Sequence, residues 1–337
     1  MKKLLSILLT LVLVLGMSTA VLANDQSEYS DMSSVTIEKE YKLTNPGTLS
    51  PAETFNFTIA RTSVTDAGAG VNTSNMPLPT IGTVAYTKGE AGSVTAKKNI
   101  TVNLPEYISV GIYTYTINES AGNNAGVTYY GGDIILVVTV IEQNGKIRIA
   151  AVHTETPVSP SYDEESNKSD KFSNEYSAGN LEIKKIVTGN LGDKEKYFDV
   201  TVTLTGVSGK VYDNPYAVTG GSNSTNPVGI SVGTPATFKL KDGETITIAN
   251  LPYHVTYTVV EADYTGNPDD YDNAQYVFSD ADKKIDSAKD TVAISNNKDG
   301  AIDTGISLDS IPYMILLAGA GIGILVLFSR KRKINKI

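Results

Sequence analysis

Three kinds of polar side chain recur twice in this sequence, each at the end of a short run in which apolar residues alternate with other residues. In the first set a lysine ends the run 35–39, a glutamate the run 113–119 and an asparagine the run 172–174. The six residues are Lys39, Glu119 and Asn174, and then Lys185, Glu261 and Asn296. Because alternate residues of a strand share a face, all six should point into an apolar surface.

Burial of these side chains would change their chemistry. A buried lysine or glutamate costs several kcal/mol unless it is neutral or paired, and desolvation lowers the pKa of the lysine and raises that of the glutamate. A neutral amine is a nucleophile, and the carboxamide carbon of an asparagine is an electrophile. A neutral glutamate hydrogen-bonded to both could polarise the carbonyl and move protons so that ammonia leaves. The product would be a lysine-to-asparagine isopeptide bond.

Two simpler interpretations stay open at the level of the sequence. The lysine and glutamate could form buried ion pairs without further reaction. Alternatively, a register error of one residue would turn every one of these side chains to the solvent.

Other chemistry finds little support in the sequence. There is no cysteine, and His153 and His254 are far apart, without metal-ligand spacing. The acidic stretch 263–272 lacks the order of an EF-hand. A net charge of −9 argues against a nucleic-acid partner. We therefore predict no cofactor, no metal and no enzyme: the two sets would each react once, within the chain.

The elements that must position these residues are predicted to be β-strands. The chain is rich in Val, Ile, Thr and Tyr, in short alternating runs separated by Gly, Asn, Asp and Pro. The clearest candidates are 54–59, 113–117, 134–141, 197–204 and 257–260. Strands spaced in this way predict all-β, sandwich-like domains.

An internal repeat divides the chain near residues 177–180. Each half opens with a lysine-ending strand, continues with an aromatic strand, contains Asn-Leu-Pro before a strand ending in glutamate, and closes with Ser-Asn. The simplest account is two tandem β-sandwich domains, residues 34–177 and 180–298.

The two ends of the chain predict export and anchoring. Residues 1–23 have the charged, apolar and small-residue layout of a signal peptide, which would leave 24–33 as a flexible mature N-terminus. Residues 311–329 are long and apolar enough to span a membrane, and the basic tail 330–337 would stay in the cytoplasm. The intervening segment 299–310 contains Thr304-Gly305, which resembles the cell-wall sorting signal that sortases cut between Thr and Gly, without the Leu-Pro of its commonest form.

These features together resemble the two-domain major pilins of Gram-positive bacteria, with their pilin isopeptide-linkage domains. The resemblance rests on the Ile-Glu-Lys and Ile-Lys-Lys first strands, the strands ending in Glu119 and Glu261, the Ser-Asn ends and the Thr-Gly tail. It implies Ig-like sandwiches and a pilus on the cell surface. It further implies bonds Lys39–Asn174 and Lys185–Asn296, with Glu119 and Glu261 as the assisting acids.

The resemblance also implies polymerisation. A pilin-specific sortase would form an acyl-enzyme at Thr304, and a lysine of the next identical subunit would resolve it, in a fibre with tip and basal pilins that is attached to peptidoglycan. Lys168 lies about where the family places that lysine, with Lys171 as the second choice, although no Tyr-Pro-Lys motif is present. The alternative function is a wall-anchored adhesin or stalk that is never polymerised.

Overall fold

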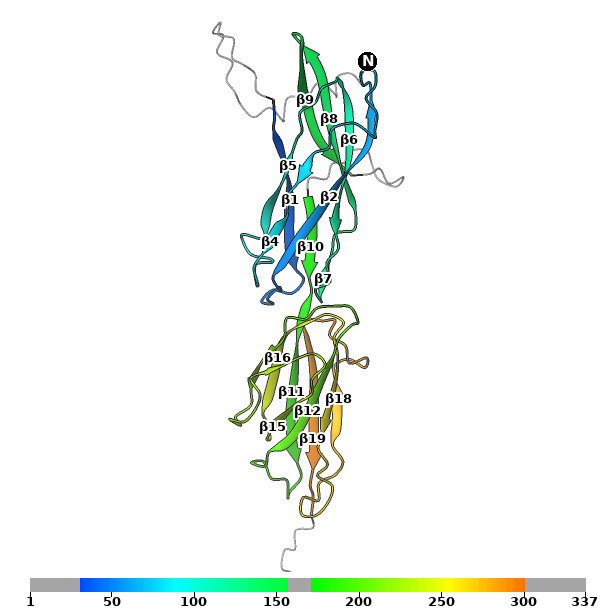
Figure 1. Cartoon of the computed structure of the whole chain (residues 1–337). Helices are drawn as coiled ribbons and strands as arrows, with labels where there is room; N and C mark the ends of the chain where they lie inside the picture. Colours follow the sequence, from blue (N-terminus) through cyan, green and yellow to red (C-terminus); the bar gives the residue numbers. More distant parts are fainter. Residues whose placement is uncertain (1–30, 157–170, 301–337) are drawn as a thin grey trace, which may run out of the picture.

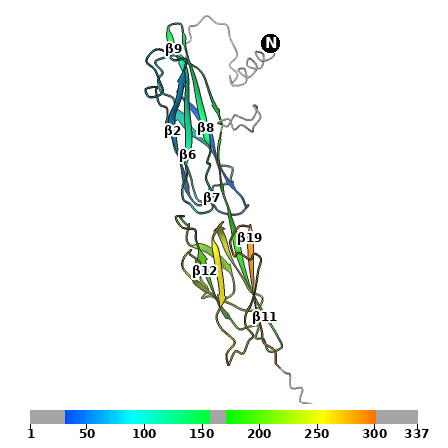
Figure 2. The ribbon, with the colours of Figure 1, turned by 90° about the vertical axis from the view of Figure 1, so that its right-hand side faces the viewer.

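The computed structural model describes residues 31–156 and 171–300, and in them it contains two domains arranged end to end (Figure 1). Both domains are built from β-sheets, which confirms the predicted all-β class. A view turned by 90° shows the same separation (Figure 2). The signal peptide, Lys168, Thr304-Gly305 and the C-terminal apolar segment lie outside the described residues. Within these residues, no helix has the length and apolar character needed to cross a membrane.

The first domain consists of β1 to β10. Their bounds are β1 Ser34–Leu43, β2 Glu53–Thr65, β3 Thr80–Ile81, β4 Val84–Tyr86, β5 Lys97–Asn103, β6 Gly111–Ser120, β7 Val127–Thr128, β8 Asp133–Gln143, β9 Lys146–Glu155 and β10 Lys171–Tyr176. One sheet has the order β3-β5-β1-β10-β7 and the other β4-β2-β6-β8-β9.

The second domain follows after a single residue and consists of β11 to β19. Their bounds are β11 Ala178–Thr188, β12 Phe198–Thr205, β13 Tyr216–Gly220, β14 Gly229–Ile230, β15 Ala236–Leu240, β16 Thr245–Pro252, β17 Thr256–Glu261, β18 Gln275–Phe278 and β19 Lys289–Asn297. Its sheets have the orders β14-β13-β16-β11-β19-β18 and β15-β12-β17.

Each domain places its first and last strands side by side and parallel. β1 pairs with β10, and β11 pairs with β19. Parallel neighbours need a long crossover between them, and here the rest of the domain supplies it. The two ends of each domain therefore lie on adjacent strands of one sheet.

Alternation of buried and exposed residues explains how the two sheets of a domain face each other. β6 buries every second residue, so that Tyr113, Tyr115, Ile117 and Glu119 share the inner face. The same alternation on β1 and β10 buries residues of the opposite sheet, and both sets belong to one apolar core. A second core of the same kind fills the second domain.

Polar contacts join the two domains at the junction. The Asn250 side chain pairs with the backbone of Leu49 through two hydrogen bonds, from Nδ2 to the Leu49 oxygen and from the Leu49 nitrogen to Oδ1, both 2.7 Å. Asn45 Nδ2 donates to the Tyr253 hydroxyl at 2.7 Å. The linking residue Ser177 uses its own backbone N–H to the first domain and its carbonyl to the second. Both domains therefore restrain the chain on either side of the junction.

We expect Asn250→Ala to loosen the junction without unfolding either domain. Loss of two hydrogen bonds should cost about 1–2 kcal/mol of inter-domain stabilisation, and small-angle scattering should detect a wider range of inter-domain angles. Asn226 is the matched control, because its amide makes the same double hydrogen bond to Lys239 within the second domain. Asn226→Ala should give the scattering profile of the wild type. If Asn250→Ala also gives that profile, the two hydrogen bonds between Asn250 and Leu49 do not set the inter-domain angle.

Candidate functional site: two buried Lys, Glu and Asn clusters

The first cluster combines residues from both sheets of the first domain. Lys39 on β1 lies opposite Phe172 of β10, and Asn174 lies two residues further along, opposite Tyr41. The lysine and the asparagine are thus diagonal neighbours on the same face of adjacent parallel strands. Glu119 comes from β6 in the facing sheet. The fold brings together three residues that are up to 135 positions apart.

Glu119 bridges the two groups that would react. Lys39 Nζ donates to Glu119 Oε2 at 2.7 Å and also contacts Asn174 Oδ1. Asn174 Nδ2 donates to Glu119 Oε1. Relative exposures are 0% for Lys39, 8% for Glu119 and 2% for Asn174. An amine, a carboxamide and an acid therefore meet where water has little access.

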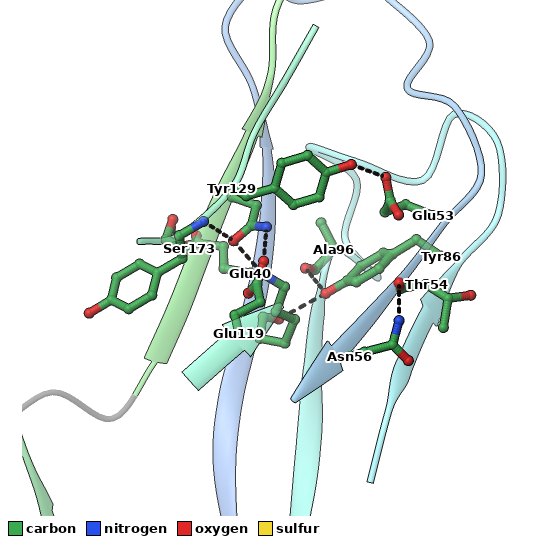
Figure 3. A network of polar contacts seen from close by, with 12 residues as sticks. Glu40, Glu53, Thr54, Asn56, Tyr86, Ala96, Glu119, Tyr129 and Ser173 are labelled. Atoms are coloured by element: carbon green, nitrogen blue, oxygen red, sulfur yellow. Dashed lines mark hydrogen bonds and ion pairs between the residues drawn. The ribbon is translucent and has the colours of Figure 1, made fainter. Parts of the chain in front are cut away.

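Two aromatic side chains contact Lys39, one at its amine and one at its backbone oxygen. Its Nζ lies 4.0 Å from the centroid of the Phe55 ring, within the range of a cation–π contact. The Tyr86 hydroxyl lies 2.9 Å from the backbone oxygens of both Lys39 and Ala96, so its single proton can be donated to either of them; Figure 3 shows the contact with Ala96. These contacts hold β1 and the lysine in place.

A backbone group adds a feature that no sequence pattern indicated. The N–H of Tyr130 donates to Asn174 Oδ1 at 3.3 Å. Attack on the carboxamide carbon would place negative charge on this oxygen, and an N–H aimed at it would stabilise that charge.

The second cluster places the same three kinds of side chain at equivalent positions of the second domain, but neither carboxylate oxygen of Glu261 has a hydrogen-bond partner among the described residues. Lys185 on β11 lies opposite Ile294 of β19, and Asn296 is again two residues further along, opposite Val187. Lys185 Nζ contacts Asn296 Oδ1 and lies 3.1 Å from Glu261 Oε2 on β17. The Phe198 ring lies 4.1 Å from the same nitrogen. Relative exposures are 0% for Lys185, 7% for Glu261 and 2% for Asn296.

Burial shifts the pKa values in the direction that the reaction needs. Desolvation lowers the pKa of Lys39 to about 8, against the opposing attraction of Glu119. It also lowers the pKa of Lys185, opposed by Glu261, and raises the pKa of Glu261, opposed by Lys185. Each shift increases the share of the neutral form, which is the nucleophile in the lysine and the proton donor in the glutamate.

The structure settles which way the predicted residues point. All six are buried, so the interpretation with a one-residue register error is wrong. The ion-pair interpretation describes the Lys39–Glu119 and Lys185–Glu261 contacts correctly but omits the asparagine that touches each lysine. Of the two lysines predicted as inter-subunit acceptors, Lys168 lies outside the described residues, and Lys171 is the first residue of β10, with its Nζ 3.5 Å from Glu40 Oε2.

Family models match both domains of this chain. A model described as a Spy0128-like isopeptide containing domain matches residues 35–177, and a model described as a domain of unknown function (DUF7601) matches residues 179–299.

Known proteins match the chain along most of its length. A protein named "Pilin" from Streptococcus pyogenes serotype M1 is 27% identical over 305 residues, which cover 84% of this chain and 86% of that protein. The pilus tip adhesin Cpa of Streptococcus pyogenes is 32% identical over 133 residues, but these are only 18% of its length. The crystal structure of the major pilin from Streptococcus pyogenes shares the fold with a TM-score of 0.52 at 22% identity, over 80% of this chain and all of that one.

When the bond in the first domain cannot form, we expect the buried amine of Lys39 to make the free energy of unfolding of that domain depend on pH. In Asn174→Ala no bond can form, so Lys39 keeps a pKa of about 8 when folded against about 10.5 when unfolded. Between these values the unfolded chain binds more protons, so the free energy of unfolding of the first domain should rise with pH, by up to about 1 kcal/mol per pH unit. Denaturant titrations at pH 8 and 9.5 measure this rise. The wild type, whose Lys39 would be an amide, should lack it, and a flat profile in the variant would contradict the lowered pKa.

Proposed function

Since the chain is a two-domain homologue of the major pilin of Streptococcus pyogenes, we propose that it is the shaft subunit of a sortase-polymerised pilus, closed in each domain by a self-formed isopeptide bond. It is a structural protein of the Gram-positive cell surface rather than an enzyme. The observation that carries the proposal is the convergence of a buried lysine, glutamate and asparagine in both domains, at the same strand positions.

The proposed bond forms by transfer of an acyl group within the chain. Neutral Lys39 Nζ attacks Asn174 Cγ, and the resulting oxyanion accepts a hydrogen bond from the Tyr130 N–H. Glu119 delivers a proton to the departing Nδ2 and takes one from the attacking nitrogen, and ammonia leaves. Glu119 ends in its starting protonation state. Lys185, Glu261 and Asn296 take the same roles in the second domain.

The position of each bond suits a protein that is pulled from its ends. The bonds would join the first and last strands of each domain and close loops of 135 and 111 residues. By analogy with a disulfide, closure of a 100-residue loop would stabilise the folded domain by about 4.7 kcal/mol. Force that enters a domain through one strand would leave through its covalently joined neighbour, so that the domain could not extend.

Export and assembly complete the proposal. Residues 1–23 would direct secretion, and the segment 311–329 with its basic tail would hold the precursor in the membrane until a pilin-specific sortase cuts between Thr304 and Gly305. The domain boundaries 34–177 and 180–298 would then enclose two Ig-like sandwiches. Identical subunits, tip and basal pilins and finally peptidoglycan would be the covalent partners.

One comparison supports a second candidate function. The similarity to a pilus tip adhesin is consistent with stapled domains in a protein that is displayed without being polymerised. Such a protein would give a single band on denaturing gels of cell-wall extracts, whereas a shaft subunit gives a ladder that vanishes when the sortase is deleted.

We expect purified residues 24–300 to have a mass lower than that of the sequence by two ammonia molecules. Glu119→Ala should restore one ammonia and lower the thermal stability of the first domain, because the assisting acid is gone. Glu53 is the control: this carboxylate accepts from Tyr129 in the same domain but touches neither reactant in the proposed step (Figure 3). Glu53→Ala should therefore keep the full deficit. An unshifted wild-type mass would exclude the bonds, and a full deficit in Glu119→Ala would exclude its role.

We expect Lys168→Ala to abolish the high-mass ladder on cells. The acceptor amine must be charged and accessible at rest, unlike Lys39 and Lys185, so its loss should leave both intramolecular bonds intact. The mass of the monomer and a gel of cell-wall extracts measure the two effects separately. Lys171→Ala is the comparison variant; loss of the ladder in this variant alone would assign the acceptor role to Lys171.

A further inference from the structure

The acid of the second cluster is held differently from that of the first. Each oxygen of the Glu119 carboxylate takes part in a hydrogen bond, one with Lys39 and one with Asn174. Glu261 Oε2 lies 3.1 Å from Lys185 Nζ, but neither carboxylate oxygen of Glu261 has a hydrogen-bond partner among the described residues. Hydrogen bonds of its own side chain therefore do not fix this carboxylate, and the backbone that carries it must be held by other contacts.

That backbone lies at the edge of a sheet and at the end of a strand. β17 is the last strand in the order β15-β12-β17, where it pairs with β12. Glu261 is the final residue of β17 and lies opposite Val200 of β12. An edge strand presents N–H groups that have no partner within its sheet, and the end of a strand is where local opening costs least.

A tyrosine from the facing sheet binds this open edge. The Glu261 N–H donates to the Tyr276 hydroxyl at 2.8 Å. Tyr276 belongs to β18, the edge strand of the other sheet, which lies beside the Asn296-bearing strand β19 (Figure 1). Its ring stacks on that of Phe278, with 6.1 Å between the centroids and 12° between the planes. The hydroxyl thus joins the two sheets where the acid must meet the asparagine.

The strand register places the same tyrosine close to the reactants. Tyr276 lies opposite Ile294 of β19, and Ile294 lies opposite Lys185 of β11 on its other side. Asn296 is two residues further along β19, on the same face as Ile294. Glu261, Tyr276 and Asn296 also line one cavity of about 240 Å³. The tyrosine is therefore a neighbour of the whole second cluster.

We propose that Tyr276 is a positioning residue for the second isopeptide bond: its hydroxyl holds the end of β17 so that Glu261 meets Lys185 and Asn296. This inference rests on the proposed function, because it concerns how one of the two bonds forms. The hydroxyl accepts a backbone N–H, and Glu261 still moves the protons of the reaction. A misplacement of about 1 Å can slow a reaction by roughly 10²-fold, so a single backbone hydrogen bond can matter more to the rate than to the fold.

The test is the rate at which each domain of Tyr276→Phe loses ammonia. Residues 24–300 are synthesised in a short pulse, and the masses of the intact chain and of proteolytic fragments from each domain are followed over time. Phenylalanine keeps the ring that stacks on Phe278 but cannot accept the N–H. We expect ammonia loss from the second domain to slow by roughly 10- to 100-fold, and loss from the first domain to keep the wild-type rate.

Tyr212→Phe is the matched control. The Tyr212 hydroxyl accepts the Val207 N–H at 2.6 Å in the same domain, so this variant removes the same kind of hydrogen bond and should leave both rates unchanged. Thermal unfolding of Lys185→Ala with and without Tyr276→Phe measures the structural contribution alone, because the second bond cannot form in either. A tyrosine with only a structural role would lower this midpoint and leave the rate of ammonia loss as in the wild type.

The outcomes separate this proposal from the proposed function. If the wild type never loses the second ammonia, both are excluded. If the wild type loses it and Tyr276→Phe reacts at the same rate, or if Tyr276→Phe and Tyr212→Phe are slowed equally, the role of Tyr276 is excluded and the bond stands. If Tyr276→Phe does not fold, Phe278→Leu takes its place; this variant removes the stacked ring, keeps the hydroxyl and should slow the second bond by a smaller factor, and an unchanged rate would overturn the proposal.

Discussion

The structure depends on the burial of two lysine amines. Lys39 and Lys185 are fully buried, and an unpaired ammonium in such a place would destabilise its domain severely. The cost falls when the amine is neutral or paired, and here an acid and a carboxamide meet the amine in the same apolar space. The parallel pairing of the first and last strands brings the asparagine to the lysine, and the facing sheet supplies the glutamate. Groups that would be a liability in an ordinary core here become the reactants of the proposed bond.

The same arrangement divides the molecule into covalent and non-covalent stretches. Within each domain the proposed bond would join the strands by which the chain enters and leaves. Between the domains the structure shows hydrogen bonds, such as those of Asn250 to Leu49 and of Asn45 to Tyr253. A pulling force would therefore act first on the junction, where contacts re-form after they break, and not on the cores.

The two domains surround their buried lysine, glutamate and asparagine differently. In the first, the asparagine oxygen also accepts the N–H of Tyr130, and both sheets have five strands. In the second, the acid-bearing sheet has three strands, and neither carboxylate oxygen of Glu261 has a hydrogen-bond partner among the described residues. At 27% identity to the streptococcal pilin, the sequence comparison does not reveal these differences between the two domains.

The inward direction of the reactive side chains follows from the order of the amino acids, because strand geometry alternates with a period of two residues whatever the rest of the chain does. The burial of Lys39, Glu119 and Asn174 could be predicted in this way, and the repeat extended the prediction to the second domain. The choice of neighbouring strands, in contrast, belongs to the folded chain. The two-residue offset between lysine and asparagine arises between strands that are distant in sequence, and the N–H of Tyr130 is a backbone group that no side-chain pattern reveals.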